Sequence, residues 1–523
     1  MTEFRAVRRR WIPISVWLLA AVALSQPRTW RASSSVSSSP RSCALLPHHP
    51  LAVLLTAFWL LCLSGMRGSV RFGILAAAVA LYFGTVRGFE SQGDMVPRPV
   101  WRWQKTASEA VAADRATREK ATGQPIGEPT AEDYPEFRNI KRDGVVAGLA
   151  LATDWVANPP RQRWRQPAGE GYAGFVVVGT AAVTLEQRGP NEAVVCYDAD
   201  TGHERWDYQY PAEFRESTGG DGPRATPTIA GGDVYSLGAT GILVRLDGVT
   251  GKPKWRVEVL AVGNLNVEWG MAGSPLVVDQ LVVVNCGRQA EAFDGKAVAA
   301  YDRDTGKPVW QAGSRKAGYA APMVATLCGV RQVLTFDAAA VAGFDLTTGK
   351  ELWNFAWEHT GDPGINVGQP LVLDGDRVFI SAGYGKGAAM VQLKKSGDVI
   401  EATQLWTSSA MKCKFTSPVF RGGFIYGIDD GVLACIDATT GKRKWKDGRY
   451  GHGQLLLSGD LIIVGSETGK LALVEASPAD FKEVASLQVL EGSKNWNHLA
   501  LARGRAYVRN HKEMACYDLP KKG

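Results

Sequence analysis

The stretch 194-VVCYDADTGHERW-206 decides the fold of this chain. An apolar run ends at Asp198, Thr-Gly follows three and four residues later, and Trp206 stands eight residues after the Asp. The same spacing occurs five times, with these Asp, Gly and Trp residues: Asp198, Gly202, Trp206; Asp247, Gly251, Trp255; Asp302, Gly306, Trp310; Asp345, Gly349, Trp353; Asp437, Gly441, Trp445. A motif that returns along the chain in this way indicates stacked supersecondary units.

Each part of the motif has a structural role. The apolar run is typical of a buried strand. The Asp carboxylate is suited to accept backbone N–H groups of the turn that follows it. The Gly supplies a positive φ for a tight hairpin, and the Trp on the next strand is large enough to wedge between neighbouring sheets. The repeated residues therefore predict architecture and say little about activity.

Weaker copies complete the count. They run from Val391 to Trp406, at Leu473–Glu475 and at Ala515–Asp518, which makes eight units of four strands each. Trp164 stands before the first unit, while the last unit stops one strand short. We therefore expect an all-β, eight-bladed β-propeller over residues 161–519, in which an N-terminal strand closes the last blade and removes its exposed edge. The alternative is a solenoid of the same units, which needs capping repeats.

These units resemble the quinoprotein (PQQ)-type repeat of quinoprotein alcohol dehydrogenases and of BamB-like proteins. The motif is specific for that propeller superfamily and not for one activity. The segment Tyr134–Arg138, together with Arg142–Gly144, also resembles the lead-in of large bacterial families that carry this propeller.

The first hundred residues differ in kind from the rest. They contain eleven Arg, no Lys and three acids, a net charge of 11 − 3 = +8, while the whole chain carries +7. The excess is therefore a membrane-topology signal, and we expect no nucleic-acid partner. Apolar stretches at about 11–25, 44–66 and 71–87 predict a membrane anchor of two or three helices within residues 1–90. The alternative, core helices of a soluble domain, lacks a polar stripe to face water.

The first apolar stretch fits either a cleaved signal peptide or a signal anchor. Both place the propeller on the periplasmic (extracytoplasmic) side of the cytoplasmic (inner) membrane, because an uncleaved inside N-terminus with three spans and a cleaved outside N-terminus with two spans each leave the propeller outside. Arg67 and Arg71 also favour a cytoplasmic loop between the last two spans. Residues 91–160 are predicted to be an interfacial segment and a linker, with a short exposed helix over residues 107–122.

Cysteine and metal patterns are weak. Cys196, Cys435 and Cys516 occupy one repeat position in different blades, too far apart to bridge. A disulfide among Cys286, Cys328 and Cys413 stays open. The His residues show no metal-ligand spacing, and the Gly-rich stretch 382–387 is interpreted as a hairpin turn.

Propellers bind ligands at the mouth of the central channel, where the inner strands begin. The Pro residues that open those strands place eight residues there: Arg224, Glu268, Trp269, Tyr319, Asn366, Lys414, His452 and Trp496. Basic, amide and aromatic side chains on one axis are suited to an anionic or planar ligand. The alternative is that they cap strands and fill the channel together with water.

The leading hypothesis is a membrane-anchored binding or scaffolding module for a protein or a small ligand. It needs no cofactor, and the resemblance to BamB suggests a protein partner in envelope assembly. Helical spans and the lack of a lipobox Cys depart from that lipoprotein.

The second hypothesis, implied by the resemblance to the dehydrogenases, is a pyrroloquinoline quinone (PQQ) oxidoreductase with calcium. Arg224, Trp269, Asn366 and Lys414 would contact the quinone, and Glu268 and Asn366 are candidate members of the calcium set. The chain has no adjacent Cys pair such as those enzymes carry. A third hypothesis is a sensor that acts through the membrane hairpin.

Overall fold

A computed structural model describes residues 58–90, 98–260, 264–289, 297–358, 364–492 and 494–522. It divides into two compact units, Met1–Gly88 and Phe89–Gly523. The described part of the first unit contains a π-helix, η1 (Trp59–Leu63), and one α-helix, α3 (Gly68–Thr85). Strands β1 (Val86–Glu90) and β2 (Arg98–Trp101) follow along the chain.

Helix α3 coincides with the apolar stretch predicted at 71–87. It is the one helix among the described residues that is long and apolar enough to cross a membrane, and none of its residues is buried. The stretch at 11–25 lies outside the described residues, as does most of 44–66. The number of membrane spans therefore stays a prediction.

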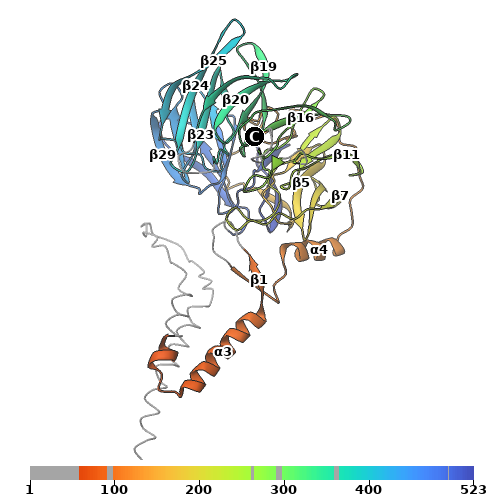
Figure 1. Cartoon of the computed structure of the whole chain (residues 1–523), viewed down its shortest axis with the longest axis vertical. Helices are drawn as coiled ribbons and strands as arrows, with labels where there is room; N and C mark the ends of the chain where they lie inside the picture. Colours follow the sequence, from red (N-terminus) through yellow and green to blue (C-terminus); the bar gives the residue numbers. More distant parts are fainter. Residues whose placement is uncertain are drawn as a thin grey trace, which may run out of the picture. The chain divides into compact units, whose positions relative to one another are not determined.

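The second unit contains eight four-stranded antiparallel sheets (Figure 1). From the inner to the outer strand, blades 1 to 4 are β4 (Val176–Val178), β5 (Ala181–Arg188), β6 (Asn191–Asp198), β7 (Glu204–Pro211); β8 (Thr228–Ala230), β9 (Asp233–Leu237), β10 (Ile242–Asp247), β11 (Pro253–Glu258); β13 (Leu276–Val278), β14 (Leu281–Asn285), β16 (Val298–Asp302), β17 (Pro308–Ala312); and β18 (Met323–Leu327), β19 (Val330–Phe336), β20 (Ala340–Asp345), β21 (Glu351–Ala356).

Blades 5 to 8 are β22 (Leu371–Leu373), β23 (Arg377–Ala382), β24 (Gly387–Ser396), β25 (Val399–Ser408); β26 (Val419–Arg421), β27 (Phe424–Asp429), β28 (Val432–Asp437), β29 (Arg443–Arg449); β30 (Gln454–Ser458), β31 (Leu461–Gly465), β32 (Lys470–Glu475), β33 (Glu483–Gln488); and β34 (Ala500–Ala502), β35 (Arg505–Arg509), β36 (Glu513–Asp518), β3 (Arg161–Pro167). A separate two-stranded sheet is formed by β12 (Asn264–Leu265) and β15 (Arg288–Gln289).

The ring closes as the sequence predicts. Strand β3 pairs antiparallel with β36, and Trp164 lies opposite Cys516. The inner strand of blade 1 contacts those of blades 2 and 8, so first and last blades are neighbours. Eight blades and closure by an N-terminal strand are confirmed, and the solenoid is excluded.

The repeat turns form as expected. Asp345 Oδ1 accepts hydrogen bonds from the backbone N–H of Thr348 at 2.7 Å and from its hydroxyl at 2.8 Å. The five repeat glycines all have positive φ, between 68° and 74°. A side chain at these positions would be strained, which explains why Gly occupies the turn.

The repeat Trp joins neighbouring blades. Trp206 of blade 1 donates from Nε1 to the carbonyl of Gly248 in blade 2 at 2.9 Å, and its ring covers the Cα of Gly251. The same docking onto the following repeat Gly is made by Trp164 on Gly202, Trp255 on Gly306, Trp310 on Gly349 and Trp406 on Gly441. Trp353 differs, because its Nε1 donates to Gln332 within its own blade.

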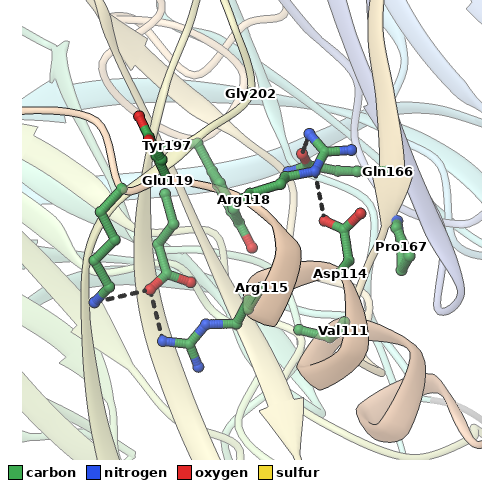
Figure 2. A pocket seen from close by; sticks show the side chains of 11 residues that line it. Val111, Asp114, Arg115, Arg118, Glu119, Gln166, Pro167, Tyr197 and Gly202 are labelled. Atoms are coloured by element: carbon green, nitrogen blue, oxygen red, sulfur yellow. Dashed lines mark hydrogen bonds and ion pairs between the residues drawn. The ribbon is translucent and has the colours of Figure 1, made fainter.

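Residues 107–160, assigned above to a linker, pack along the propeller. Helix α4 (Ala107–Thr117) begins with a capping box between Thr106 and Glu109. Arg115 on α4 contacts Glu204 at 2.7 Å and Asp207 at 3.0 Å, beside the small pocket of Figure 2. Ile126 is buried in the core of blades 1 and 2.

The seven described cysteines are all free. Burial raises the pKa of Cys196, Cys435 and Cys516 to about 12, so these thiols pack as small apolar groups. The Gly-rich stretch 382–387 is a turn between β23 and β24, with Lys386 N–H donating to the Gly383 carbonyl.

Candidate functional site

A cavity of about 600 Å³ lies at the channel mouth, beside the segments that lead into the inner strands. Six of the eight predicted residues line it together: Arg224, Trp269, Tyr319, Lys414, His452 and Trp496. Its volume lies within the range of small-molecule sites, roughly 300–1,000 Å³.

The other two predicted residues lie outside this lining. The Glu268 carboxylate accepts from Lys316 Nζ at 2.6 Å and from the Tyr319 hydroxyl at 3.3 Å, on the exposed side. Asn366 is fully buried, and its Nδ2 donates to the Asp337 carbonyl at 2.8 Å. The sequence placed both near the mouth but could not show which way their side chains point.

Aromatic rings form much of the wall. Trp269 and Tyr319 lie 5.8 Å apart on one side, measured between ring centroids. Trp496 lies 4.8 Å from Phe415 and 5.5 Å from Tyr172. Such faces offer large, flat, apolar contact area to a ligand.

Cations lie among these rings. The Lys414 ammonium is 4.7 Å from the Tyr384 ring centroid and 5.0 Å from that of Phe415. Within the described part of the chain, no carboxylate lies within ion-pair distance of it. Lys494 Nζ lies 4.9 Å from the Trp496 ring. The mouth is therefore positively charged on the side of Lys414 and Lys494.

Arg224 differs from Lys414, because its guanidinium is hydrogen-bonded to backbone carbonyls. Its guanidinium donates to the carbonyls of Gly220 and Gly222, each at 2.5 Å, and lies 4.7 Å from the Phe214 ring. It thereby holds the loop that brings Thr218 to the cavity, where Thr218 accepts a hydrogen bond from Trp269 Nε1 at 2.7 Å. Arg224 thus shapes the mouth as well as adding positive charge.

Two histidines in the lining are neutral at pH 7. Burial lowers the pKa of His452 and holds that of His498 well below the usual value. The buried Nδ1 of each ring has no hydrogen-bond partner among the described residues. Glu467, the carboxylate of the lining, accepts from Trp496 Nε1 at 2.8 Å and from the backbone N–H of His452 at 3.1 Å.

The floor of the cavity comes from an unexpected place. Phe137 lines it and meets the His498 ring edge-on, with 4.5 Å between centroids. Phe137 belongs to residues 134–146, which pair with the inner strands at Tyr134–Val177 and Val145–Leu457. The sequence did contain a signal for this segment, namely the motif around Arg138 and Arg142. Because the motif lies outside the repeats, its spacing could not show that it reaches the channel.

The residues at the mouth do not fit a calcium–quinone centre. Calcium takes six to eight oxygen ligands, several from carboxylates. Glu467 is the one carboxylate among the described residues that line the cavity. In the part of the chain that the structure describes, no cluster of three acidic, His or Cys side chains is suited to hold a metal ion. The free cysteines provide no disulfide beside the cavity.

The repeat geometry, the closure and the mouth define the class of quinoprotein-type eight-bladed β-propellers. A family profile described as outer membrane protein assembly factor BamB matches residues 144–323 and 337–522. The chain therefore belongs to this BamB family.

Solved structures share the fold at low identity. BamB from Moraxella catarrhalis is 16% identical, with a TM-score of 0.48 over 70% of this chain and 99% of that one. The quinohemoprotein alcohol dehydrogenase ADHIIG from Pseudomonas putida HK5 is 13% identical, with a TM-score of 0.51 over 75% of this chain and 81% of that one. The quinohemoprotein alcohol dehydrogenase from Comamonas testosteroni is 14% identical, with a TM-score of 0.51 over 80% and 84%. The two dehydrogenase likenesses, with TM-scores above 0.5, show the propeller fold alone.

One curated relative is the serine/threonine-protein kinase AfsK of Streptomyces griseus. It is 30% identical over 119 residues, which cover 20% of this chain. The chain spans only 12% of the length of that kinase.

Proposed function

We propose that this protein is a membrane-anchored, extracytoplasmic binding module that holds a small anionic ligand with a flat apolar face at its channel mouth. The observation that carries the proposal is the Lys414 ammonium, which lies in a cavity of about 600 Å³ between two aromatic rings. No acidic partner for it occurs in the described residues.

The chemistry of the lining selects such a ligand. A cation in partly desolvated, aromatic surroundings attracts an anion more strongly than one in open water. Trp269 and Trp496 offer flat surfaces to a planar or ring-shaped body. The neutral His452 and His498 add hydrogen-bonding capacity without adding charge.

The anchor and the cell-envelope partner are also part of the proposal. The basic first hundred residues and the apolar helix α3 support attachment to the inner membrane. The family description concerns outer membrane protein assembly, which supports a protein partner in the envelope. Under this proposal the propeller presents its mouth to the extracytoplasmic space.

The first test is calorimetric titration of the full-length chain in nanodiscs with 2,6-naphthalenedicarboxylate, a flat dianion. We expect binding that weakens about tenfold in Lys414→Gln, because one charge-assisted contact of about 1.4 kcal/mol is lost. The matched control is Lys307→Gln, which removes an exposed lysine of a blade-3 turn outside the lining. Equal affinity in Lys414→Gln and wild type would refute the site.

A second titration, with pyrroloquinoline quinone and calcium, distinguishes the binding module from the dehydrogenase of the second hypothesis. We expect no dye-linked oxidation of alcohols, since the donors at the mouth do not match that centre. Calcium-dependent quinone binding together with dye reduction would replace the binding module by an oxidoreductase.

A further inference from the structure

Two arginines of one short segment lie in the centre of the propeller. Arg138 and Arg142 are 0% and 1% exposed, although their segment is polar and lies outside the repeats. Buried guanidinium groups are costly unless their donors find partners. Most of their donors bond main-chain carbonyls at the starts of inner strands, while Arg138 Nε has no hydrogen-bond partner among the described residues.

Arg142 binds blades 3 and 4. Its Nη1 donates to the carbonyls of Ser274 at 2.9 Å and Pro322 at 2.7 Å, and its Nη2 donates to that of Pro275 at 2.7 Å. Its Nε donates to the Glu136 carboxylate at 2.7 Å, which neutralises its charge within the segment.

Arg138 binds blades 6 and 7. Its guanidinium donates to the carbonyls of Ser417 and Leu455, each at 3.2 Å, and to that of Pro418 at 2.6 Å. No carboxylate pairs with it among the described residues. The two arginines thus satisfy buried carbonyls on two separate parts of the ring, which requires a donor fork of fixed geometry.

The loop between them is tightly folded. Arg138, Asn139 and Arg142 have φ of 58°, 70° and 55°, and Gly144 has 78°. A Cβ at Gly144 would lie 2.3 Å from Arg138 Nη2. Non-glycine residues hold such conformations only where the surrounding contacts fix them, so this loop is shaped by its bonds to the blades.

Both arms of the loop run along inner strands. Tyr134 N–H donates to the Val177 carbonyl, and Val146 N–H donates to that of Leu457, each at 2.8 Å. Between these arms, Phe137 reaches the cavity and forms its floor. Residues 134–146, hereafter the channel plug, therefore fill the channel directly behind the ligand cavity.

We propose that the channel plug is the sensing floor of the binding site, so that a bound anion and the inserted plug stabilise each other. This proposal rests on the function proposed above. Coupling of this kind is reciprocal: whatever free energy the plug adds to ligand binding, the ligand adds to plug insertion.

Two contacts carry the coupling. Phe137 supplies apolar surface to the ligand. The next residue, Arg138, carries a positive charge that interacts with the nearby Asp143 but forms no ion pair among the described residues. The field of Arg138 reaches the lining, because it adds to burial in holding the pKa of His498 low. An anion in the cavity therefore gains from Arg138 only while the plug is inserted.

The plug also leads toward the N-terminal part of the chain. Residues before Tyr134 continue along blades 1 and 2 through Ile126, which is buried there, to α4. A change at the mouth is thereby linked through one continuous segment to the residues that precede the propeller.

Hydrogen exchange measured by mass spectrometry on the full-length chain in nanodiscs tests this, with and without saturating 2,6-naphthalenedicarboxylate. We expect the dianion to slow exchange at residues 134–146 at least threefold. Arg138→Met should weaken binding of the dianion about tenfold and speed exchange of the plug. Arg118→Met is the matched control, since Arg118 lies beside α4 and bonds Gln166 and Asp114 there.

A second variant guards against misfolding of Arg138→Met. Phe137→Ala keeps the hydrogen bonds of Arg138 and Arg142 to the blades. In this variant the dianion should no longer slow hydrogen exchange of the channel plug. If the dianion binds wild type in a Lys414-dependent way but leaves exchange at 134–146 unchanged, the plug proposal is wrong and the binding module stands. If the dianion does not bind wild type, both proposals fall.

Discussion

Gly251 shows how the lack of a side chain joins two blades. Its backbone has φ of 69°, and the Trp206 ring of the preceding blade covers it so closely that a Cβ would lie 2.5 Å from Cε3. The positive φ and the close packing of the Trp206 ring therefore each require Gly at position 251. The same pair of demands applies at the other docked repeat glycines.

Gly251→Ala should lower the free energy of unfolding by about 3–4 kcal/mol, because it adds backbone strain and overpacking. Urea unfolding followed by tryptophan fluorescence measures the loss. Gly329→Ala is the matched control: φ is 71° and nothing lies within 4 Å of its Cβ position, so only the strain of about 1 kcal/mol remains. Equal losses in the two variants would contradict the role of Trp206.

Residue types alone predicted part of this arrangement. The Asp–Thr contacts and the positive φ of the repeat Gly follow from the turn chemistry of one motif. The docking of Trp206 on Gly251 does not, because spacing along the chain cannot show which blade a side chain faces. Trp353 shows the limit, since the same motif there bonds within its own blade.

At the scale of elements, α4 is a helix held by its own cap and by the propeller. Glu109 N–H donates to Thr106 Oγ1 at 3.2 Å, and Thr106 N–H donates to Glu109 Oε2 at 2.9 Å. The Ser108 hydroxyl accepts from Gly189 N–H at 2.8 Å. The sequence predicts a helix over 107–122, but it ends at Thr117 because Arg118 is extended.

Thr106→Ala should destabilise α4 by about 1 kcal/mol, because the backbone N–H of Glu109 loses its acceptor, the Thr106 hydroxyl. Hydrogen exchange at residues 107–117 should become faster, while the blades keep their protection. Thr117→Ala serves as control, since its hydroxyl bonds only the Asp114 carbonyl at the other end. Loss of protection across the blades would show that α4 supports the whole ring.

The sequence could predict α4 but not where it packs. Residues 107–160 carry no copy of the repeat motif, and the sequence predicted a linker with a short exposed helix there. In the structure Arg115, Arg138 and Arg142 bond carboxylates or carbonyls of blades far along the chain. Such partners are invisible without the fold, so a polar stretch was interpreted as a linker.

At the scale of the whole molecule, the repeat Asp residues and Glu192 make the free energy of unfolding depend on pH in opposite directions. Hydrogen bonds from Thr250, Thr305 and Thr348 lower the pKa of the repeat residues Asp247, Asp302 and Asp345. Burial raises the pKa of Glu192 in blade 1 to about 7.

The signs of the two effects differ. The repeat carboxylates stabilise the fold above their unfolded pKa of 3.8, and this contribution is lost as the pH falls through their lower folded values. Folded Glu192 binds its proton more tightly than the unfolded chain does. Its stabilising effect is therefore complete below its usual pKa of 4.5 and is lost as the pH rises to about 7.

We therefore expect the urea midpoint to be highest at about pH 4 to 4.5, with a decline toward lower pH and another between about pH 4.5 and 7. Unfolding from pH 2 to pH 9, followed by tryptophan fluorescence, measures the profile. Glu192→Gln should flatten the alkaline limb, and Asp345→Asn should make the acid limb shallower. A Glu192→Gln profile that matches wild type would refute the assignment of the alkaline limb.

The sequence predicted the position of the candidate site better than the full set of residues that line it. Pro residues at the starts of inner strands placed six lining residues together, as the cavity shows. Phe137 and His498 were missed, the first because it enters from outside the repeats. The side chains of Glu268 and Asn366 point elsewhere, which strand spacing alone does not reveal.

The closure of the ring orders events during synthesis. Strand β3 leaves the ribosome before any blade, and its partner β36 is made only after all the strands of blades 1 to 7. Strand β3 must therefore wait without its partner until β36 is made, while the earlier blades can already dock through their Trp residues. A chain that stalls before β36 keeps an open ring, which gives quality-control proteases a structural sign of an unfinished product.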